Sequence, residues 1–246
     1  MKKNYFKGKI RISFPWDLPN RIHGPAVMFD VNAASHNIAY LTTVVKELFV
    51  ATKDNIRRAL DLIPDAVLVG ESDDPDLQDK FLVSNHASNI NRADLKNKKV
   101  ILITNNGTHT LNELWQKGAG PIVAAHYANL QTAVYWILSN FINSPVITLV
   151  PAGGREAIYA KNHNLLEDLL CAQAMEKLLR GKKPDLKTDF ARARKYIDEH
   201  NPQYWPTKED DLKLIFTKKD LYKVVTVCVK DKNGLLKIEN INKIIR

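Results

Sequence analysis

The chain has 246 residues, of which 45% are apolar and 26% are charged, and its formal net charge is +9. This composition is that of an ordinary globular protein with a substantial core, and it excludes an intrinsically disordered chain. No apolar run reaches the roughly 20 residues that a membrane-spanning helix needs, and neither a secretory leader nor a CxxC zinc pattern is expected.

The net charge and the two cysteines indicate the setting in which the protein acts. Lysines are spread along the chain without interleaved aromatic residues, so we expect a solvated basic surface or an anionic small ligand, and not nucleic-acid binding. Cys171 and Cys228 lie far apart in apolar surroundings, which is typical of reduced thiols in a cytoplasmic protein. We therefore expect a cytoplasmic protein with no membrane partner, and a homodimer is one candidate assembly.

Short apolar runs alternate with helical stretches along the chain. Strands are predicted at 9–14, 25–30, 47–51, 66–70, 99–104, 121–125, 145–150 and 223–229. Helices are predicted at 35–46, 53–62, 109–117, 127–142, 164–179, 188–199 and 208–216. The alternation predicts a three-layer α/β/α sandwich with a largely parallel or mixed central sheet. We expect a single domain over 1–246, in which 184–246 form a C-terminal αβ extension that rejoins the sheet.

Acidic residues stand where ligands bind in open α/β sheets, beyond the carboxyl ends of the strands. Asp30 and Glu71 each follow an apolar strand directly, and Glu167 and Asp168 open an apolar helix. Clustered carboxylates need a neutralising cation, and hard oxygen ligands of this kind suit Mg²⁺. The competing interpretations are a helix cap at Asp30, a solvated acidic loop at 71–76 and ordinary first-turn acids in the helix.

The segment TNNGT at 104–108 offers more hydrogen-bonding groups than a turn requires. Asn106, Gly107 and Thr108 lie just before a predicted helix, where free N–H groups and the helix dipole favour an anion. The alternative is a plain turn with Thr108 as the helix cap, which leaves Asn105 and Asn106 unexplained.

Histidines and one glycine in the polar loops are further candidates for binding a metal or an anion. Five of the seven histidines lie in or beside these loops, namely His36, His86, His109, His126 and His163. Neutral imidazoles bind transition metals, and protonated ones bind anions. Gly153 lies in a loop whose backbone N–H groups are able to face an anion.

Taken in order, these segments resemble the motifs of the 2-phosphosulfolactate phosphatase family (the ComB family). The family segments DVLRATST, GERGG, GNSP and TTNGT correspond here to DVNAASHNI at 30–38, GESDD at 70–74, SNHA at 84–87 and TNNGT at 104–108. The family's Asn-containing loop and its glycine turn followed by Glu-Asp correspond to Asn129 and to 152–168. The C-terminal EDDLKLIFTKKDLYKVVTVCV resembles the last αβ unit of the family, so the resemblance covers nearly the whole chain.

The resemblance implies an α/β/α fold and a Mg²⁺-dependent phosphoric monoester hydrolase that acts on 2-phosphosulfolactate, in coenzyme M biosynthesis. On that basis the catalytic candidates are Asp30, Glu71 and Glu167, and the metal-ligand candidates are Asp30, Glu71 and Asp168. The expected substrate contacts are Asn85, Asn106, Gly107, Thr108, Asn129, Gly153, His36 and His86. The sequence leaves open which carboxylate is ligand, acid–base group or nucleophile, and a covalent aspartyl-phosphate is one of the options.

Two family arginines are missing, because Ala33 and Ser72 stand in their places. His36 and His86 replace part of that positive charge only when they are protonated. We therefore expect a small anionic phosphorylated substrate and leave its identity open. The alternatives are a catalytically inactive anion-binding protein of the same fold, and a hydrolase that uses a histidine-bound transition metal.

Overall fold

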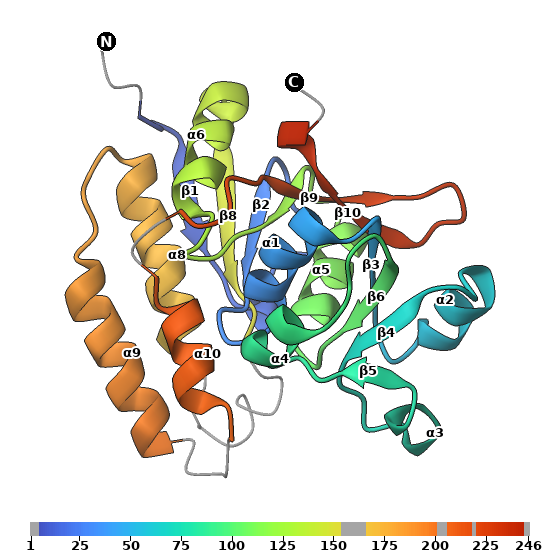
Figure 1. Cartoon of the computed structure of the whole chain (residues 1–246). Coiled ribbons are helices and arrows are strands. Elements are labelled where there is room, and N and C mark those ends of the chain that lie inside the picture. The colour runs from blue at the N-terminus through green and yellow to red at the C-terminus, as the bar shows by residue number, and fades with distance from the viewer. Residues whose placement is uncertain (1–4, 154–165, 201–205, 218–219, 244–246) are drawn as a thin grey trace.

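A computed structural model of the chain describes residues 5–153, 166–200, 206–217 and 220–243 (Figure 1). The strands are β1 Lys9–Ile12, β2 Ala26–Phe29, β3 Glu47–Ala51, β4 Val67–Gly70, β5 Phe81–Val83, β6 Lys99–Ile103, β7 Ile122–Ala124, β8 Val146–Pro151, β9 Thr226–Lys230 and β10 Leu236–Asn240. The helices are α1 Ala34–Val44, α2 Ile56–Leu62, α3 Pro75–Gln78, α4 Ala87–Arg92, α5 Gly107–Gln116, α6 Leu130–Phe141, α8 Leu166–Leu179, α9 Leu186–His200 and α10 Lys208–Ile215, with short 3₁₀ turns at Pro15–Asp17 and Ile241–Lys243.

The ten described strands form one sheet in the order β1-β8-β2-β7-β9-β10-β3-β6-β4-β5. The first four strands of that order are parallel to one another, and so are the last four. Between the two groups lies the β9–β10 hairpin, which pairs antiparallel with β7 on one side and with β3 on the other. The strands of the predicted 184–246 extension are thus part of the sheet, while the single domain over 1–246 stays a prediction.

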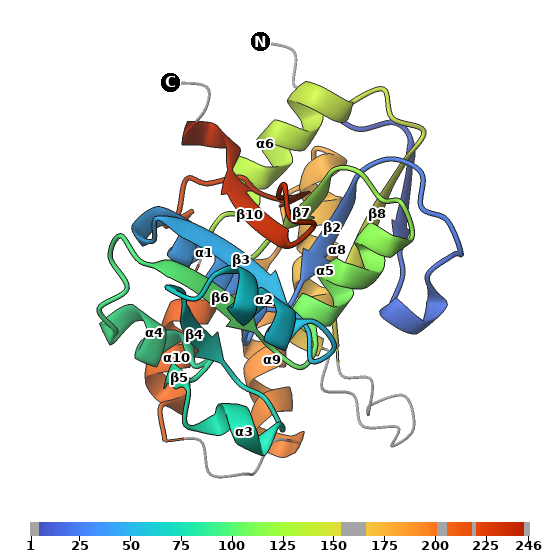
Figure 2. The same cartoon turned by 90° about the vertical axis from the view of Figure 1, so that its right-hand side faces the viewer.

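Helices cover both faces of the sheet, which confirms the predicted α/β/α class (Figures 1 and 2). Alternating side chains of β2 explain the layers. Ala26 and Met28 face a core that includes residues of α1 and α5, whereas Val27 and Phe29 face a core built with α6 and α8. No helix among the described residues combines the length and the apolar character needed to cross a membrane.

The prediction was wrong about the C-terminal strands, because it placed one strand after residue 200 and the structure has two. The second, β10, reads LKIEN, and its buried Leu236 and Ile238 alternate with the half-buried Lys237 and Glu239. With only two apolar residues, this strand has too short an alternation to separate it from a loop. The short elements β5, α3 and α4 were missed for the same reason.

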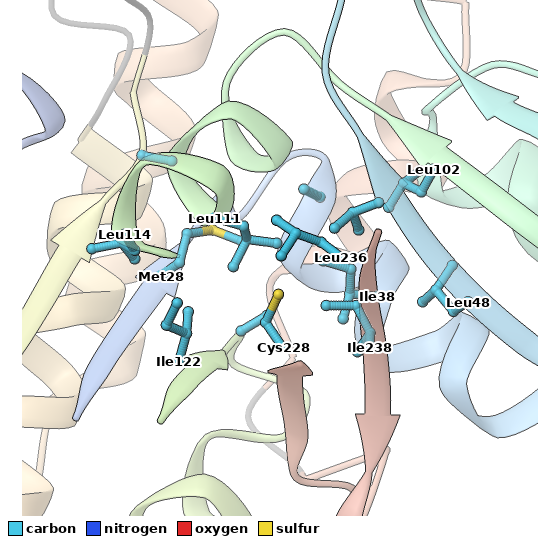
Figure 3. Packing of buried hydrophobic residues seen from close by; sticks show 14 of the residues in the cluster. Met28, Ile38, Leu48, Leu102, Leu111, Leu114, Ile122, Cys228, Leu236 and Ile238 are labelled. Atoms are coloured by element: carbon cyan, nitrogen blue, oxygen red, sulfur yellow. The ribbon is translucent and has the colours of Figure 1, made fainter. Parts of the chain in front are cut away.

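The carboxyl ends of β2 and β6 meet even though the two parallel groups are joined through an antiparallel hairpin. Two helices pack on strands of both groups: α1 contacts β2 and β3, and so does α5. Figure 3 shows the core that results, in which Met28 of β2 and Leu111 of α5 lie to one side of Leu236 of the hairpin and Leu102 of β6 lies to the other. A sheet of this width also accumulates a large twist, and the packing on α1 and α5 draws the two strand ends together.

Candidate active site

Asp30 directly follows β2 and is held in the turn that leads into α1. Its own N–H donates to Ser35 Oγ at 3.1 Å, and Ser35 Oγ donates to the Asp30 carbonyl at 2.8 Å. One carboxylate oxygen, Oδ2, accepts the Ala34 N–H at 3.2 Å. Burial raises the pKa of the Asp30 carboxyl to about 6, and the charge of Glu71 raises it further against the lowering effect of the Ala34 and Gly107 N–H groups. Asp30 is therefore fixed in position and costly to ionise.

Gly107, the first residue of α5, lies directly against this carboxylate. A Cβ atom at Gly107 would lie 2.3 Å from Asp30 Oδ2 and 2.4 Å from Ala34 Cβ. Any residue other than glycine would push α5 away from Asp30. This contact brings the 104–108 segment, and with it the positive end of the α5 dipole, to the Asp30 carboxylate.

The first turn of α8 adds Glu167 and Asp168 from 137 residues farther along the chain. Asp168 Oδ1 accepts the Val31 N–H at 2.7 Å, and Oδ2 accepts the Gly153 N–H at 3.2 Å. Glu167 Oε1 accepts the side-chain amide of Asn32 at 2.7 Å. The strand-end loop of β2 thus binds both acids of α8, and Asn32 is a site residue that the sequence analysis missed.

Asp30, Glu167 and Asp168 act on one another electrostatically. Burial raises the pKa of Glu167 to about 7 and that of Asp168 well above its ordinary value, and in both cases the charge of Asp30 adds to the rise. Glu167 Oε2 and Asn32 Oδ1 are buried oxygens with no hydrogen-bond partner among the described residues. Three buried carboxylates with spare acceptor oxygens require either protons or a cation.

Glu71 follows β4 and approaches Asp30 from the other half of the sheet. Its Oε1 accepts the Asn105 side-chain amide at 3.1 Å. Burial raises the pKa of Glu71, the charge of Asp73 raises it further, and the Asn105 N–H and His86 lower it. Its charge is among those that raise the pKa of Asp30, so the two acids are neighbours.

The other acids of the 71–76 loop are neutralised by basic residues around the start of α2. Lys53 forms an ion pair with Asp73, and Arg57 pairs with both Asp74 and Asp76 at 2.9 Å. All of these pairs are largely exposed, as in a solvated surface network. This loop therefore behaves as the solvated acidic loop that the sequence left open, apart from Glu71.

Thr108 serves the turn that carries α5, and the alternative interpretation of Thr108 as the helix cap is wrong. The cap position is Asn106, whose side chain makes no capping bond. Thr108 Oγ1 donates to the Thr104 carbonyl at 2.8 Å and accepts the Thr104 N–H at 3.2 Å. Thr104 Oγ1 in turn accepts the Thr108 N–H at 3.3 Å. These reciprocal bonds close the turn, so substrate contact by the Thr108 side chain stays an untested prediction.

Asn129 and Asn85 are tied to the backbone around them. Asn129 is fully buried, and its Oδ1 accepts the His126 N–H at 2.8 Å. This bond holds the turn before α6, which begins at Leu130, three residues after the predicted start at 127. The Asn85 carbonyl accepts the Asn37 side-chain amide at 2.7 Å, and the Asn85 side chain lowers the pKa of Glu71. Asn85 therefore lies beside an acid of the site, whereas Asn129 holds a turn.

His36 does not replace a missing arginine. It is fully buried, and burial lowers its pKa to about 4, so it is neutral at pH 7. His86 Nδ1 lies 3.4 Å from the carboxylate of Asp211, which is itself buried. The part of His86 in substrate binding stays a prediction.

His126 also gives little support to a transition-metal site. Its Nδ1 accepts the Ala128 N–H at 3.0 Å, which places the proton of the neutral ring on Nε2 and leaves no lone pair there. Among the residues described, no three His, Cys, Asp or Glu side chains form a group that could hold a metal ion. His163 lies outside the described residues.

A comparison with known families decides the assignment. A family model for 2-phosphosulpholactate phosphatase matches residues 15–231 of the 246. The chain belongs to this family. The resemblance of the strand-end segments is thereby confirmed, and membership of the 2-phosphosulpholactate phosphatase family makes the chain a phosphoric monoester hydrolase. The matched range contains every candidate residue discussed above. No curated protein matches the chain.

A divalent cation fits the residues that the 2-phosphosulpholactate phosphatase fold brings together here. The donor atoms are hard oxygens, and the unpartnered Glu167 Oε2 and Asn32 Oδ1 lie beside acids that repel one another. Mg²⁺ takes one or two carboxylates and keeps several waters, so it does not need a preassembled set of three protein ligands.

Proposed function

We propose that this protein is a Mg²⁺-dependent phosphatase that hydrolyses the phosphate monoester of a small acidic metabolite, with 2-phosphosulfolactate as the first candidate. One observation carries the proposal: Asp30, Glu167 and Asp168 are buried together, the charge of Asp30 raises the pKa of both acids of α8, and the Asp30 carboxylate lies at the N-terminus of α5. Such a cluster suits a reaction in which a cation and a phosphate are held side by side.

In this proposal one or two of the carboxylates Asp30, Glu71 and Asp168 would hold the cation and the others would bind its waters, with the unpartnered oxygens of Glu167 and Asn32 as further acceptors. When bound, Mg²⁺ would offset the negative charge of both the carboxylates and the phosphate. The backbone bonds from Val31 and Gly153 fix the Asp168 carboxylate, so its oxygens are oriented before any ligand arrives.

The phosphate would lie at the first turn of α5. The N–H groups there have no partner within the helix, although that of Thr108 donates to Thr104 Oγ1 and that of Gly107 to Asp30, and the helix dipole favours a negative charge. Asn106 is the cap residue, and its half-buried side chain makes no hydrogen bond within the described residues. It is therefore free to donate to a phosphate oxygen.

Glu167 is the group that handles the proton. A pKa of about 7 leaves a large protonated fraction at neutral pH, and the bond from Asn32 to Oε1 leaves Oε2 to carry the proton. A proton on Oε2 would be given to the ester oxygen as the alcohol leaves.

Asn106→Ala should weaken phosphate binding about tenfold or more, because a hydrogen bond to a charged group contributes roughly 1.5–3 kcal/mol. The melting temperature should change little, since the side chain makes no bond within the described fold. Calorimetric titration of phosphate, with melting curves, measures both effects. Asn140→Ala is the matched control, an exposed asparagine on α6. Equal phosphate affinity in Asn106→Ala and the wild type would leave 104–108 as an ordinary turn.

The substrate range should be broader than the family name says. Ala33 and Ser72 stand where the resemblance places arginines, and one lost charge-assisted contact of roughly 1.5–3 kcal/mol lowers kcat/KM by about one to two orders of magnitude. We therefore expect weak turnover of 2-phosphosulfolactate. Its kcat/KM should lie within about tenfold of the kcat/KM for 2-phospholactate, which lacks the sulfonate. Ala33→Arg should raise turnover of the sulfonate ester selectively. A strong preference of the wild type for that ester would show that other residues bind the sulfonate.

A further inference from the structure

A second pocket lies where three helices of one layer meet, between the start of α6, the end of α8 and the start of α9. Its volume is about 380 Å³, within the roughly 300–1,000 Å³ of small-molecule sites. Four of the residues that line it, Tyr127, Leu130, Leu178 and Leu186, have largely apolar side chains. An apolar group of modest size would therefore be removed from water there.

The same pocket carries a net positive charge. Lys183 and Lys187 line it, and neither forms an ion pair with a residue that the structure describes. One acid, Asp185, also lines it; its carboxylate accepts the Thr188 hydroxyl at 2.7 Å and the Thr188 N–H at 3.3 Å and keeps its negative charge. Two ammonium groups against one carboxylate leave a positive charge for an anion at the edge of the apolar walls.

This pocket adjoins the candidate active site but is lined by other residues. At its near end lies Tyr127, whose pKa is raised by burial and also by the charges of Asp168 and Glu167. Its far end lies at Leu178, ten residues beyond Asp168 on α8, which corresponds to about 15 Å along the helix axis. None of the residues that line the pocket belongs to the carboxylate cluster or to the first turn of α5.

We propose that the pocket between α6, α8 and α9 is a second ligand site, for a small amphipathic anion. The aliphatic or aromatic body of the ligand would lie among Leu130, Leu178 and Leu186, and its carboxylate or sulfonate would meet Lys183 and Lys187. The inference goes beyond the proposed function and does not depend on it.

The probe for this site is anilinonaphthalene sulfonate, whose fluorescence rises in apolar surroundings. Titration of the full chain should give saturable binding at one site, and decanoate should displace the probe. Leu186→Glu, which puts a carboxylate among the apolar walls, should lower the affinity for the probe at least about tenfold. The double variant Lys183→Gln with Lys187→Gln should lower this affinity severalfold, because two exposed charges contribute modestly to binding.

The matched control is Lys80→Gln with Lys96→Gln, which removes the same charge from exposed lysines elsewhere and should leave probe binding unchanged. The lysine variants test the site even if Leu186→Glu does not fold, because both lysines are exposed. Unchanged affinity in the Lys183 and Lys187 variant, or displacement of the probe by inorganic phosphate, would overturn the proposal. In the second case the probe would be bound at the active site.

Discussion

Asp30→Asn should lower phosphate-ester hydrolysis by about a hundredfold to a thousandfold, the usual effect of removing one group that organises charge in a transition state. Asn has nearly the same shape and still accepts the Ala34 N–H, so the turn at the end of β2 should persist. Removing one of three mutually repelling charges should leave the metal-free protein at pH 8 equally stable or more stable. Phosphate-release rates and melting curves of both proteins measure this.

Two further variants sharpen that result. Asp189→Asn is the matched control, because Asp189 is also buried with a pKa raised by burial but belongs to α9 and not to the site, and it should keep wild-type activity.

In the wild type, activity should fall as the pH rises through about 7, since Glu167 must carry its proton. Glu167→Gln should be slow at every pH. Full activity in Asp30→Asn would remove Asp30 from the mechanism.

Mg²⁺ should stabilise the protein strongly at pH 8 and weakly at pH 5.5. The folded-state pKa values of Asp30 and Glu167, about 6 and about 7, lie above the ordinary values of 3.8 and 4.5. The contribution of these two groups to the free energy of unfolding is therefore fully present below about pH 4, and it is lost as the pH rises through 6 to 7 and the folded protein loses their protons. At pH 8 a cation replaces the missing protons, whereas at pH 5.5 protons compete with it.

The size of this effect follows from ligand linkage. A cation at a hundred times its dissociation constant adds about 2.7 kcal/mol, which raises the melting temperature of a chain of this length by roughly 5–10 °C. His36 titrates with the opposite sign, because burial lowers its pKa to about 4 and its contribution is lost as the pH falls from 6.5. Comparing samples with and without Mg²⁺ at each pH cancels that contribution. An equal shift at both pH values, or none, would contradict a carboxylate site.

The layers of the fold could be predicted because its main strands are short, apolar and separated by helices. The run AVMF of β2 is buried on both faces, and both its strand character and the ligand position of Asp30 follow from that pattern. The place of β9 and β10 in the middle of the sheet could not be predicted. It depends on pairing with β7 and β3, strands that lie roughly a hundred or more residues earlier in the chain.

The candidate site was predicted in outline and not in its local bonding. Asp30 and the Glu167–Asp168 pair were expected near one another from the strand-end rule and the family resemblance. Asn32 was missed, although a polar residue three positions after a buried strand was a usable signal. A solvated acidic loop after Glu71 was one of the interpretations, but its basic partners could not be foreseen, because they come from the loop and helix before β4 and are brought close only by the fold.

The measurement that tests the account most directly is phosphate release by the purified protein before and after removal of bound metal with EDTA. The proposed carboxylate site predicts hydrolysis in the presence of Mg²⁺, loss of hydrolysis after EDTA, and recovery when Mg²⁺ is returned in excess. Zn²⁺ should not restore the rate, because the candidate ligands Asp30, Glu71 and Asp168 provide hard carboxylate oxygens and no imidazole nitrogen. Hydrolysis that continues undiminished after EDTA would contradict the account.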